Sequence, residues 1–396
     1  MNLKCGSGAS NAKNTQEALN EAITSAKKEG GIDEVTFASI YFTVGHDPTD
    51  LEKAIKVSLG DVPNCGCSGE GVIAKNFSIE GDSPGISVML FAGDKIHFRN
   101  QIFENVSDND FEVGHKIGEW AKKVDKKSKC VIIFTDGLST NSSSLRDGIT
   151  STFSLFFKKK VFGGGAGDDL SMKKTYQIFN GKVYSNAVSV FSIGGKFKIA
   201  HAVNHGISPM GQEHIVTKVK DNIIYEIDGQ KAFSALKPYL HDDEVDNWGK
   251  ASAGLAVAFK APLNVIESYD EYLVRFMIQP NEDGSLLISA NAKEGDSIWI
   301  SRRDLDKIDS GIIAMAERVN SKLKAQKPFA VLNFDCAGRG RVIMEESRKM
   351  KNLRYLQNEL GASTPWAGFY TFGEFAPINN TNEFHSYTNV ILALYT

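Results

Sequence analysis

The chain has 396 residues, of which 42% are hydrophobic, and this is enough for two substantial cores. Its 45 basic and 48 acidic residues are mixed along the chain and give a net charge of -3, without the basic surface of a nucleic-acid-binding protein. No apolar run approaches the roughly 20 residues of a membrane helix, and no apolar signal region opens the chain. The five cysteines are sparse and odd in number, which suits a reducing compartment. We therefore expect a two-domain cytoplasmic protein that neither inserts into membranes nor binds nucleic acid.

The first part of the chain alternates apolar strands with amphipathic helices, the pattern of an α/β fold. Strands are expected at residues 35–43, 85–91, 95–102 and 130–134, and helices at 15–29, 50–59, 111–124 and 142–157. Ala92-Gly93-Asp94 has the composition of a hairpin turn between the second and third of these strands. Residues 130–134 are apolar on both faces, which predicts a central strand. Ser142 or Ser143 is the expected cap of the last helix.

Strands dominate from residue 168 to 228, and Asn180-Gly181 is the strongest hairpin signal in the chain. A helix near 231–240 and the polar stretch 241–250 are typical of a passage between domains. The second part then repeats the α/β pattern, with strands at 275–277, 286–291, 330–334 and 389–395 and helices at 304–325 and 344–360. The predicted fold is α/β, with mixed sheets flanked by helices and domains at residues 1–230 and 231–396.

Three stretches share one order of elements: an apolar strand, a polar turn, a helix, a short apolar strand and a glycine-containing turn. They begin at Thr36, Cys130 and Ala330 and end in residues 66–71, 163–167 and 368–373. The order is that of an internal structural repeat, and it is also the ordinary rhythm of an α/β chain. Both interpretations stay open at this point.

The glycine-rich turns that end these stretches are candidate ligand sites, because glycine lets backbone N–H groups approach a bound molecule. They supply Cys67, Ser68, Gly164, Gly165 and Asp168 as candidate binding residues. Glycine also closes ordinary tight turns, and Asp168 with Asp169 has the composition of a turn and cap pair. The turn at 163–167 lacks the Lys-Ser/Thr ending of a phosphate-binding loop, so no nucleotide cofactor is predicted.

Asp335, Arg339 and Glu374 are charged residues that follow or interrupt apolar, glycine-rich segments near the expected core. Charges in such places need partners. The Arg339 guanidinium suits a ligand carboxylate, whereas Asp335 or Glu374 suits an ammonium group. An internal ion pair among the three residues is the alternative. Aromatic residues beside them, Tyr370 among these, wall a pocket or pack in the core.

Cys67 and Cys336 lie in glycine-bounded turns and are the candidate nucleophiles of a thiol-dependent enzyme, with His205 or His385 as the base. Burial as a small apolar side chain is the alternative for each cysteine. The pair Cys65-x-Cys67 has no second pair at ligand spacing, and His201-x-x-x-His205 lacks the glutamate of a zinc-protease helix. We therefore assign no catalytic residue, metal or cofactor.

Several separate segments together carry a family resemblance. They are Gly66 to Gly71, Val161 to Asp169, Asn180 to Tyr184, His205-Gly206, Pro209-Met210-Gly211, Phe334 to Arg339, Gly368 to Glu374 and Asn382 to Thr388. In these segments the chain resembles a FIST protein, with an N-terminal and a C-terminal FIST domain over nearly its whole length. The resemblance implies a sensory protein that binds a small molecule, such as an amino acid, for signal transduction.

Similar domains occur beside signalling modules, and this chain carries no such module, so the resemblance implies a separate signalling protein as its output partner. It supplies no binding residues. The candidate ligand-binding set therefore comes from the turns and charges above: Cys67, Ser68, Gly164, Gly165, Asp168, Asp335, Cys336, Arg339, Tyr370 and Glu374. The competing hypotheses are a thiol-dependent enzyme that uses Cys336 or Cys67, and an interaction scaffold that adds a partner strand to the apolar C-terminal strand or to hairpin edges.

Overall fold

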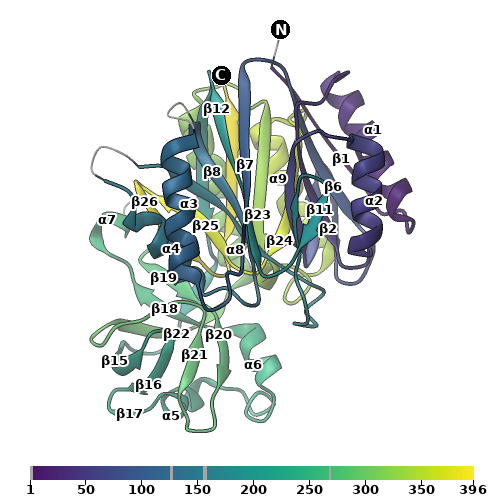
Figure 1. The fold of residues 1–396 in the computed structure, drawn as a ribbon. Coiled ribbons are helices and arrows are strands. Elements are labelled where there is room, and N and C mark those ends of the chain that lie inside the picture. Colours follow the sequence, from purple (N-terminus) through teal and green to yellow (C-terminus); the bar gives the residue numbers. More distant parts are fainter. Residues whose placement is uncertain (1–2, 125–127, 155–157, 267–268) are drawn as a thin grey trace.

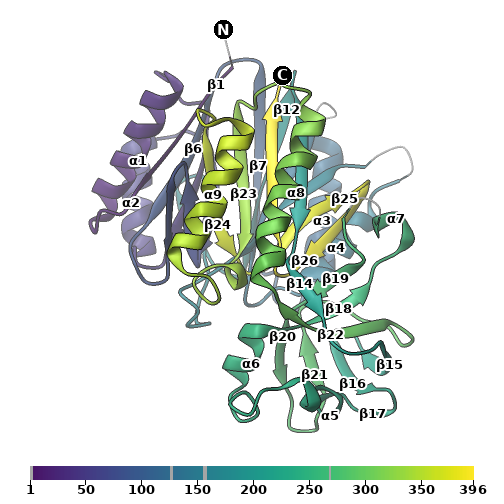
Figure 2. The same cartoon turned by 180° about the vertical axis from the view of Figure 1, so that it is seen from behind.

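Three six-stranded mixed sheets surround a common centre, and a further sheet projects from one end of this body (Figure 1). The computed structural model describes residues 3–124, 128–154, 158–266 and 269–396. The three sheets stand upright in the view, with helices on their outer faces, and Figure 2 shows the same arrangement from behind. The predicted α/β class with mixed sheets and flanking helices is confirmed.

Each of the three sheets combines strands from distant parts of the chain. The first has the order β1 (Lys4–Ser10), β6 (Ile86–Ala92), β2 (Phe37–Thr43), β3 (Asn64–Gly69), β10 (Gln177–Phe179), β11 (Lys182–Tyr184). The second has the order β26 (Thr381–His385), β25 (Glu374–Ile378), β9 (Lys160–Ala166), β8 (Ser128–Asp136), β12 (Ala187–Gly195), β7 (Ile96–Glu104). The third has the order β13 (Lys198–Asn204), β27 (Asn389–Tyr395), β23 (Ala330–Cys336), β24 (Trp366–Thr371), β4 (Gly71–Ala74), β5 (Phe77–Glu80).

One parallel strand pair, joined by a helix, lies in each sheet, and it confirms the predicted repeat. The pairs are β2 with β3, β8 with β9 and β23 with β24. Their connecting helices are α2 (Pro48–Leu59), α4 (Ser142–Ser151) and α9 (Glu346–Gly361). A second helix precedes each pair: α1 (Thr15–Gly30), α3 (Asp110–Val124) and α8 (Leu305–Leu323). Among the described residues, no helix combines the length and the apolar composition that a membrane crossing needs.

The same steric constraint recurs at one glycine in each repeat. An added Cβ would lie 1.7 Å from the carbonyl oxygen of Ile40 at Gly66, 1.9 Å from that of Ile133 at Gly163, and 1.8 Å from that of Asn333 at Gly368. These contacts are all across the parallel strand pair, at equivalent register positions. Only glycine lets the two strands approach this closely. The repeat is therefore present at the level of single residues.

Each repeat also gives a hairpin to a neighbouring sheet. After β3 the chain forms the hairpin β4–β5, which pairs with β24 of the third sheet. The hairpin β10–β11, which follows β9, pairs with β3, and the hairpin β25–β26, which follows β24, pairs with β9. The exchange is cyclic, so the three sheets cannot separate without breaking strand pairs. The three sheets therefore form one interlocked body.

Aromatic rings from all three repeats fill the centre of the body. Tyr41, Phe134 and Phe334 occupy equivalent positions in β2, β8 and β23, and Phe369 of β24 lies among them. The Phe369 ring centroid is 5.1, 5.8 and 5.9 Å from those of Tyr41, Phe134 and Phe334. Burial of such rings dominates the stability of a core, and edge-to-face pairs add to it. A site on this centre line must therefore lie at an end of the strands.

The projecting sheet, residues 207–303, is inserted between β13 and α8. Its main path is β19 (Tyr272–Arg275), β18 (Leu255–Lys260), β22 (Ser297–Arg303), β15 (His214–Lys220), β16 (Ile223–Ile227), β21 (Leu286–Ile288) and β20 (Met277–Pro280). Two short strands pair outside this path, β14 (Ile207–Pro209) with β22 and β17 (Gln230–Lys231) with β16. Four short helices accompany it: α5 (Ala232–Leu236), η1 (Lys237–Tyr239), α6 (Trp248–Gly254) and α7 (Leu263–Ile266). The predicted domain division at 230/231 falls in β17 and stays a prediction.

Local expectations fail at four places. Strands β6 and β7 do not form the expected hairpin, because the turn between them joins two repeats. Strand β6 pairs with β1 and β2, and strand β7 pairs with β12. Helix α4 is capped by Asn141 and ends at Ser151, and residues 155–157 lie outside the described residues. The glycines at 163–165 lie inside strand β9. The C-terminal strand β27 lies between β13 and β23, so its backbone is already paired and offers no edge to a partner.

Candidate functional site

Arg339 and Asp335 form a buried ion pair where strand β23 ends. The Arg339 Nε donates to Asp335 Oδ1 at 2.8 Å, and its Nη1 donates to the backbone carbonyl of His205. Asn389 Nδ2 donates to the other oxygen of Asp335 at 3.0 Å. Arg339 lies in the short helix η2 (Ala337–Arg339), four residues after its partner. The internal ion pair that the sequence left open is thus present, and Arg339 is largely occupied by protein groups.

Glu374 does not join this ion pair. Its carboxyl group accepts from the Thr371 hydroxyl, and from the Thr388 backbone N–H at 3.0 Å and hydroxyl at 2.7 Å. Complete burial raises the pKa of Glu374 to about 8, and the hydroxyls offset this only in part. Burial also raises the pKa of Asp335, against the lowering effect of the Arg339 charge. At neutral pH Glu374 is therefore mostly protonated and adds little negative charge.

The Cys336 thiol lies next to this ion pair, and burial raises its pKa well above the usual value, as it does for Cys67. A thiol must be ionised to act as a nucleophile. The expected bases are also engaged: His205 Nδ1 accepts the N–H groups of Gly206 and Ile207 at 2.8 and 2.9 Å, and His385 Nε2 lies 3.1 Å from the Ala376 carbonyl. Burial lowers the pKa of both imidazoles. This environment disfavours thiolate chemistry.

Arg303, the last residue of β22, lies beside the ion pair and is not among the site residues predicted from the sequence. Its guanidinium carbon is 5.0 Å from the ring centroid of Tyr387, and its Nη1 is 3.2 Å from the Cβ position of Gly338. All three side-chain nitrogens are buried, and none has a hydrogen-bond partner in the described part of the chain. Burial, and secondarily the charge of Arg339, lower the pKa of Arg303, yet an arginine keeps its charge at neutral pH. The guanidinium is a buried, unpaired cation.

Tyr387 links this cation to the projecting sheet. Its ring covers the Arg303 guanidinium, while its hydroxyl donates to the carbonyls of Ser252 and Leu255 at 3.0 and 3.2 Å. The Tyr387 backbone is in the left-handed region, with φ of 59°, which is costly for a bulky residue. A strained aromatic residue thus bridges the body and the projecting sheet directly over Arg303.

Four of the predicted residues serve the packing of the first and second repeats. Ser68 Oγ donates to the Gly167 carbonyl at 2.7 Å and accepts the Tyr176 N–H at 3.0 Å. Asp168 accepts the N–H groups of Met172 and Lys173 at 3.2 and 2.7 Å, so it organises its own loop. Cys67 lies in the central apolar core, and the Gly165 N–H donates to the Gly373 carbonyl at 2.8 Å.

Of the other predicted residues, one lies beside the Arg339–Asp335 ion pair and one is directed to a different contact. Gly164 pairs with Glu374 across strands β9 and β25 and therefore lies beside the Arg339 cluster. Tyr370 is next to Asp335 in the sheet register, and its hydroxyl lies 3.2 Å from Ser78 Oγ. The structure thus brings Asp335, Cys336, Arg339, Glu374 and Gly164 together. We call Arg303, Asp335, Cys336, Arg339, Glu374 and Tyr387 the junction cluster.

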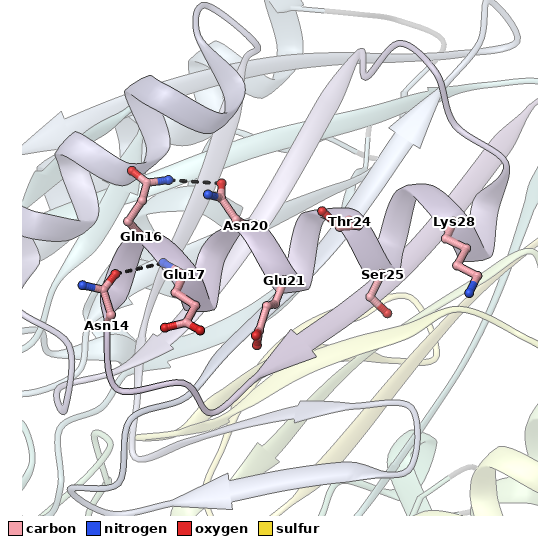
Figure 3. A pocket seen from close by; sticks show the side chains of 8 residues that line it. All are labelled: Asn14, Gln16, Glu17, Asn20, Glu21, Thr24, Ser25 and Lys28. Atoms are coloured by element: carbon pink, nitrogen blue, oxygen red, sulfur yellow. Dashed lines mark hydrogen bonds between the residues drawn. The ribbon is translucent and has the colours of Figure 1, made fainter.

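A hollow along helix α1 is the other polar feature near the surface of the first repeat, and Figure 3 shows its lining. Its side chains follow one helix. Gln16 Nε2 donates to Asn20 Oδ1 at 3.1 Å and to Ser58 Oγ at 2.9 Å, and the Glu17 N–H donates to Asn14 Oδ1 at 3.0 Å. Most of these residues are exposed and they do not converge on a point. This face has the character of a solvated helix surface.

Comparison with known proteins places both halves of the chain in one family. The FIST N domain matches residues 36–230 and the FIST C domain matches residues 232–377. An uncharacterized protein of Mycobacterium tuberculosis strain H37Rv is 21% identical over 390 residues, covering 98% of both chains. An uncharacterized protein of Methanocaldococcus jannaschii is 24% identical over 291 residues, covering 69% of this chain and 54% of its own.

Two crystal structures align with the whole chain at low similarity. They are a cyanuric acid hydrolase from A. caulinodans, with a TM-score of 0.37 and 8% identity over 100% of both chains, and a chorismatase, with a TM-score of 0.36 and 7% identity over 100% of this chain and 98% of its own. The two domain matches together span most of the sequence, and the chain belongs to the FIST family.

Proposed function

We propose that this protein is a sensory protein that binds a small metabolite carboxylate at the Arg303 guanidinium. The observation that carries the proposal is the Arg303 guanidinium, whose three nitrogens are buried and have no hydrogen-bond partner among the described residues. An unpaired buried cation is costly, and a ligand carboxylate is the natural counter-charge because its two oxygens match the guanidinium. FIST domains are generally sensory ligand-binding domains, which agrees with this role.

Charge accounting in the junction cluster supports an anionic ligand group. Arg339 and Asp335 neutralise each other, and Glu374 is mostly protonated at neutral pH because its pKa is raised to about 8. No described carboxylate forms an ion pair with Arg303. The cluster therefore has one positive charge in excess. An amino acid or a related carboxylate would supply the missing negative charge.

Tyr387 provides a route from the ligand to a signal. A carboxylate that reaches Arg303 displaces or reorients the Tyr387 ring, and this ring is bonded through its hydroxyl to Ser252 and Leu255 of the projecting sheet. The ligand then changes how the projecting sheet is held against the body. A separate signalling protein that reads the position of this sheet would be the output partner.

Thermal unfolding tests the proposal with carboxylates and their neutral amides, for example succinate with succinamide and glutarate with glutaramide. Arg303→Met keeps the bulk of the side chain and removes the charge. We expect a carboxylate to raise Tm of the wild-type protein by several degrees at millimolar concentration, the less charged analogue to raise it less, and Arg303→Met to abolish the difference. Equal shifts in wild type and variant, or no shift with any carboxylate, would contradict the proposal.

A further inference from the structure

A second cavity, lined by none of the junction-cluster residues, lies between the second and third sheets and has a volume of about 320 Å³. Its walls come from β9, β13, helix α8 and the end of β25. Lys160, Arg318 and Lys322 line it, together with His201 and Tyr269, and no lining residue is acidic. This cavity has the size of a small-molecule site and the charge of an anion site.

The three cations have no carboxylate partner among the described residues. Arg318 Nη2 donates to the Tyr269 carbonyl at 3.0 Å, and Lys322 Nζ donates to the His201 carbonyl at 3.1 Å, so each keeps unused donors. The cations also act on each other: after burial, the charges of Lys160 and Arg318 lower the pKa of Lys322. Like charges held together in this way favour an anion between them.

Two polar atoms of residues that line the cavity lack hydrogen-bond partners among the described residues. The Tyr269 hydroxyl and His201 Nδ1 are buried without a hydrogen bond in the described chain. His201 Nε2 lies 3.1 Å from the Pro377 carbonyl, and burial, with the charges of Lys322 and Lys160, lowers the pKa of His201 to about 3. The imidazole is therefore neutral. Unsatisfied buried polar groups are rare in proteins, and they point to a missing binding partner.

The repeat supplies an internal comparison for this cavity. Helices α1 and α8 each end at a C-cap residue in the left-handed conformation, Gly31 and Lys324. When the two helices are aligned at these caps, Glu29 and Lys322 occupy equivalent positions, two residues before the cap. In the first repeat Glu29 accepts from the Ser7 N–H and hydroxyl at 2.8 Å and pairs with Lys75 at 3.0 Å. At the equivalent position of the third repeat, Lys322 replaces the acidic Glu29. No described carboxylate there balances the positive charge of Lys322.

We infer that this basic cavity, lined by Lys160, Arg318 and Lys322, binds a small polyanion that carries phosphate or several carboxylates. The lining of this site includes neither Arg303 nor any other residue of the junction cluster. Three cations around one cavity recognise multiple charges, whereas the single guanidinium of Arg303 suits one carboxylate. The bound ligand supplies the negative charge that the Glu29 carboxylate supplies at the equivalent position of the first repeat.

Calorimetric titration at low ionic strength tests the inference, with pyrophosphate and citrate as separate probes. The double variant Arg318→Gln, Lys322→Gln removes two of the charges, and Lys116→Gln on the exposed face of α3 is the matched control. We expect binding of at least one probe by the wild type, at least tenfold weaker binding by the double variant, and unchanged binding by the control and by Arg303→Met. Binding of pyrophosphate alone assigns the phosphate class, and binding of citrate alone assigns the polycarboxylate class.

Binding of neither probe would overturn the inference, as would equal binding by the wild type and the double variant. The double variant is expected to fold, because it relieves repulsion among cations, and circular dichroism with urea unfolding checks this. The single variant Lys322→Gln, with an expected loss of several-fold in affinity, serves as the second test. Retained binding in Arg303→Met separates this site from the proposed carboxylate site.

Discussion

Arg303 and Arg339 lie in one cluster, yet of the two only Arg339 has hydrogen-bonding partners among the described residues. Their removal should therefore have opposite effects on stability. Arg339→Met leaves the Asp335 carboxyl group buried without its cation and should lower the free energy of unfolding by about 3–5 kcal/mol. Arg303→Met removes an unpaired buried charge and should leave stability unchanged or raise it. Urea unfolding of both variants, free of ligand, measures the difference, and similar losses in the two variants would refute the assignment.

The glycines of the repeat should be intolerant of any side chain. Alanine at Gly66, Gly163 or Gly368 places a Cβ within 2 Å of a backbone carbonyl oxygen, so the parallel strands must separate. We expect each substitution to lower the free energy of unfolding by several kcal/mol or to prevent folding, which is the upper range for single mutations. Gly249→Ala is the control, since the nearest atom to its added Cβ is 3.5 Å away. Soluble yield and thermal unfolding report the result.

The raised pKa of Glu374 makes stability depend on pH. Because this carboxyl group keeps its proton up to about pH 8 in the folded protein and loses it near pH 4.5 when unfolded, the folded state binds more protons between these values. Stability from this residue therefore falls as pH rises from about 4.5 to about 8, by at most about 1.4 kcal/mol per pH unit. Glu374→Gln should flatten the profile over this range. Denaturant unfolding at several pH values measures the difference, and parallel wild-type and variant profiles would contradict the assignment.

The cysteine thiols should resist modification in the folded protein. All five are free and buried, and burial raises the pKa of Cys67 and Cys336 well above the usual value. We expect Ellman's reagent to label none of them rapidly at pH 7.5 and all of them in urea. Rapid labelling of one thiol in the native protein, lost in Cys336→Ser or Cys67→Ser, would support the alternative hypothesis of a thiol-dependent enzyme.

Much of the fold could be predicted because local signals and tertiary structure agree. The expected strand at 389–395 coincides with β27, and the expected helix at 15–29 with α1, since each has the periodicity and turn residues of its element. The repeat was visible as a shared order of elements. Pairing was less predictable: β6 and β7 are separated by a turn of hairpin composition, yet they belong to different sheets. Local composition does not encode which sheet accepts a strand.

The candidate site was predictable only in part. Asp335, Arg339 and Glu374 stood out because each charge interrupts an apolar segment, and the structure buries all three. Arg303 ends a strand after Arg302 in an ordinary alternating pattern, and no sequence signal separates the two arginines. Arg302 pairs with Glu244, whereas the Arg303 nitrogens have no hydrogen-bond or ion-pair partner in the described part of the chain. That contrast depends on long-range packing of the projecting sheet and appears only in three dimensions.

Calorimetric titration of the ligand-free protein with the carboxylate that raises Tm most tests the central claim most directly. Wild type, Arg303→Met and Arg303→Lys are compared at one pH and one ionic strength. We predict one binding site in the wild type, at least tenfold weaker binding in Arg303→Met, and intermediate binding in Arg303→Lys, which keeps the charge without the planar fork. Equal affinity in all three proteins would show that the carboxylate binds elsewhere and that Arg303 is not its anchor.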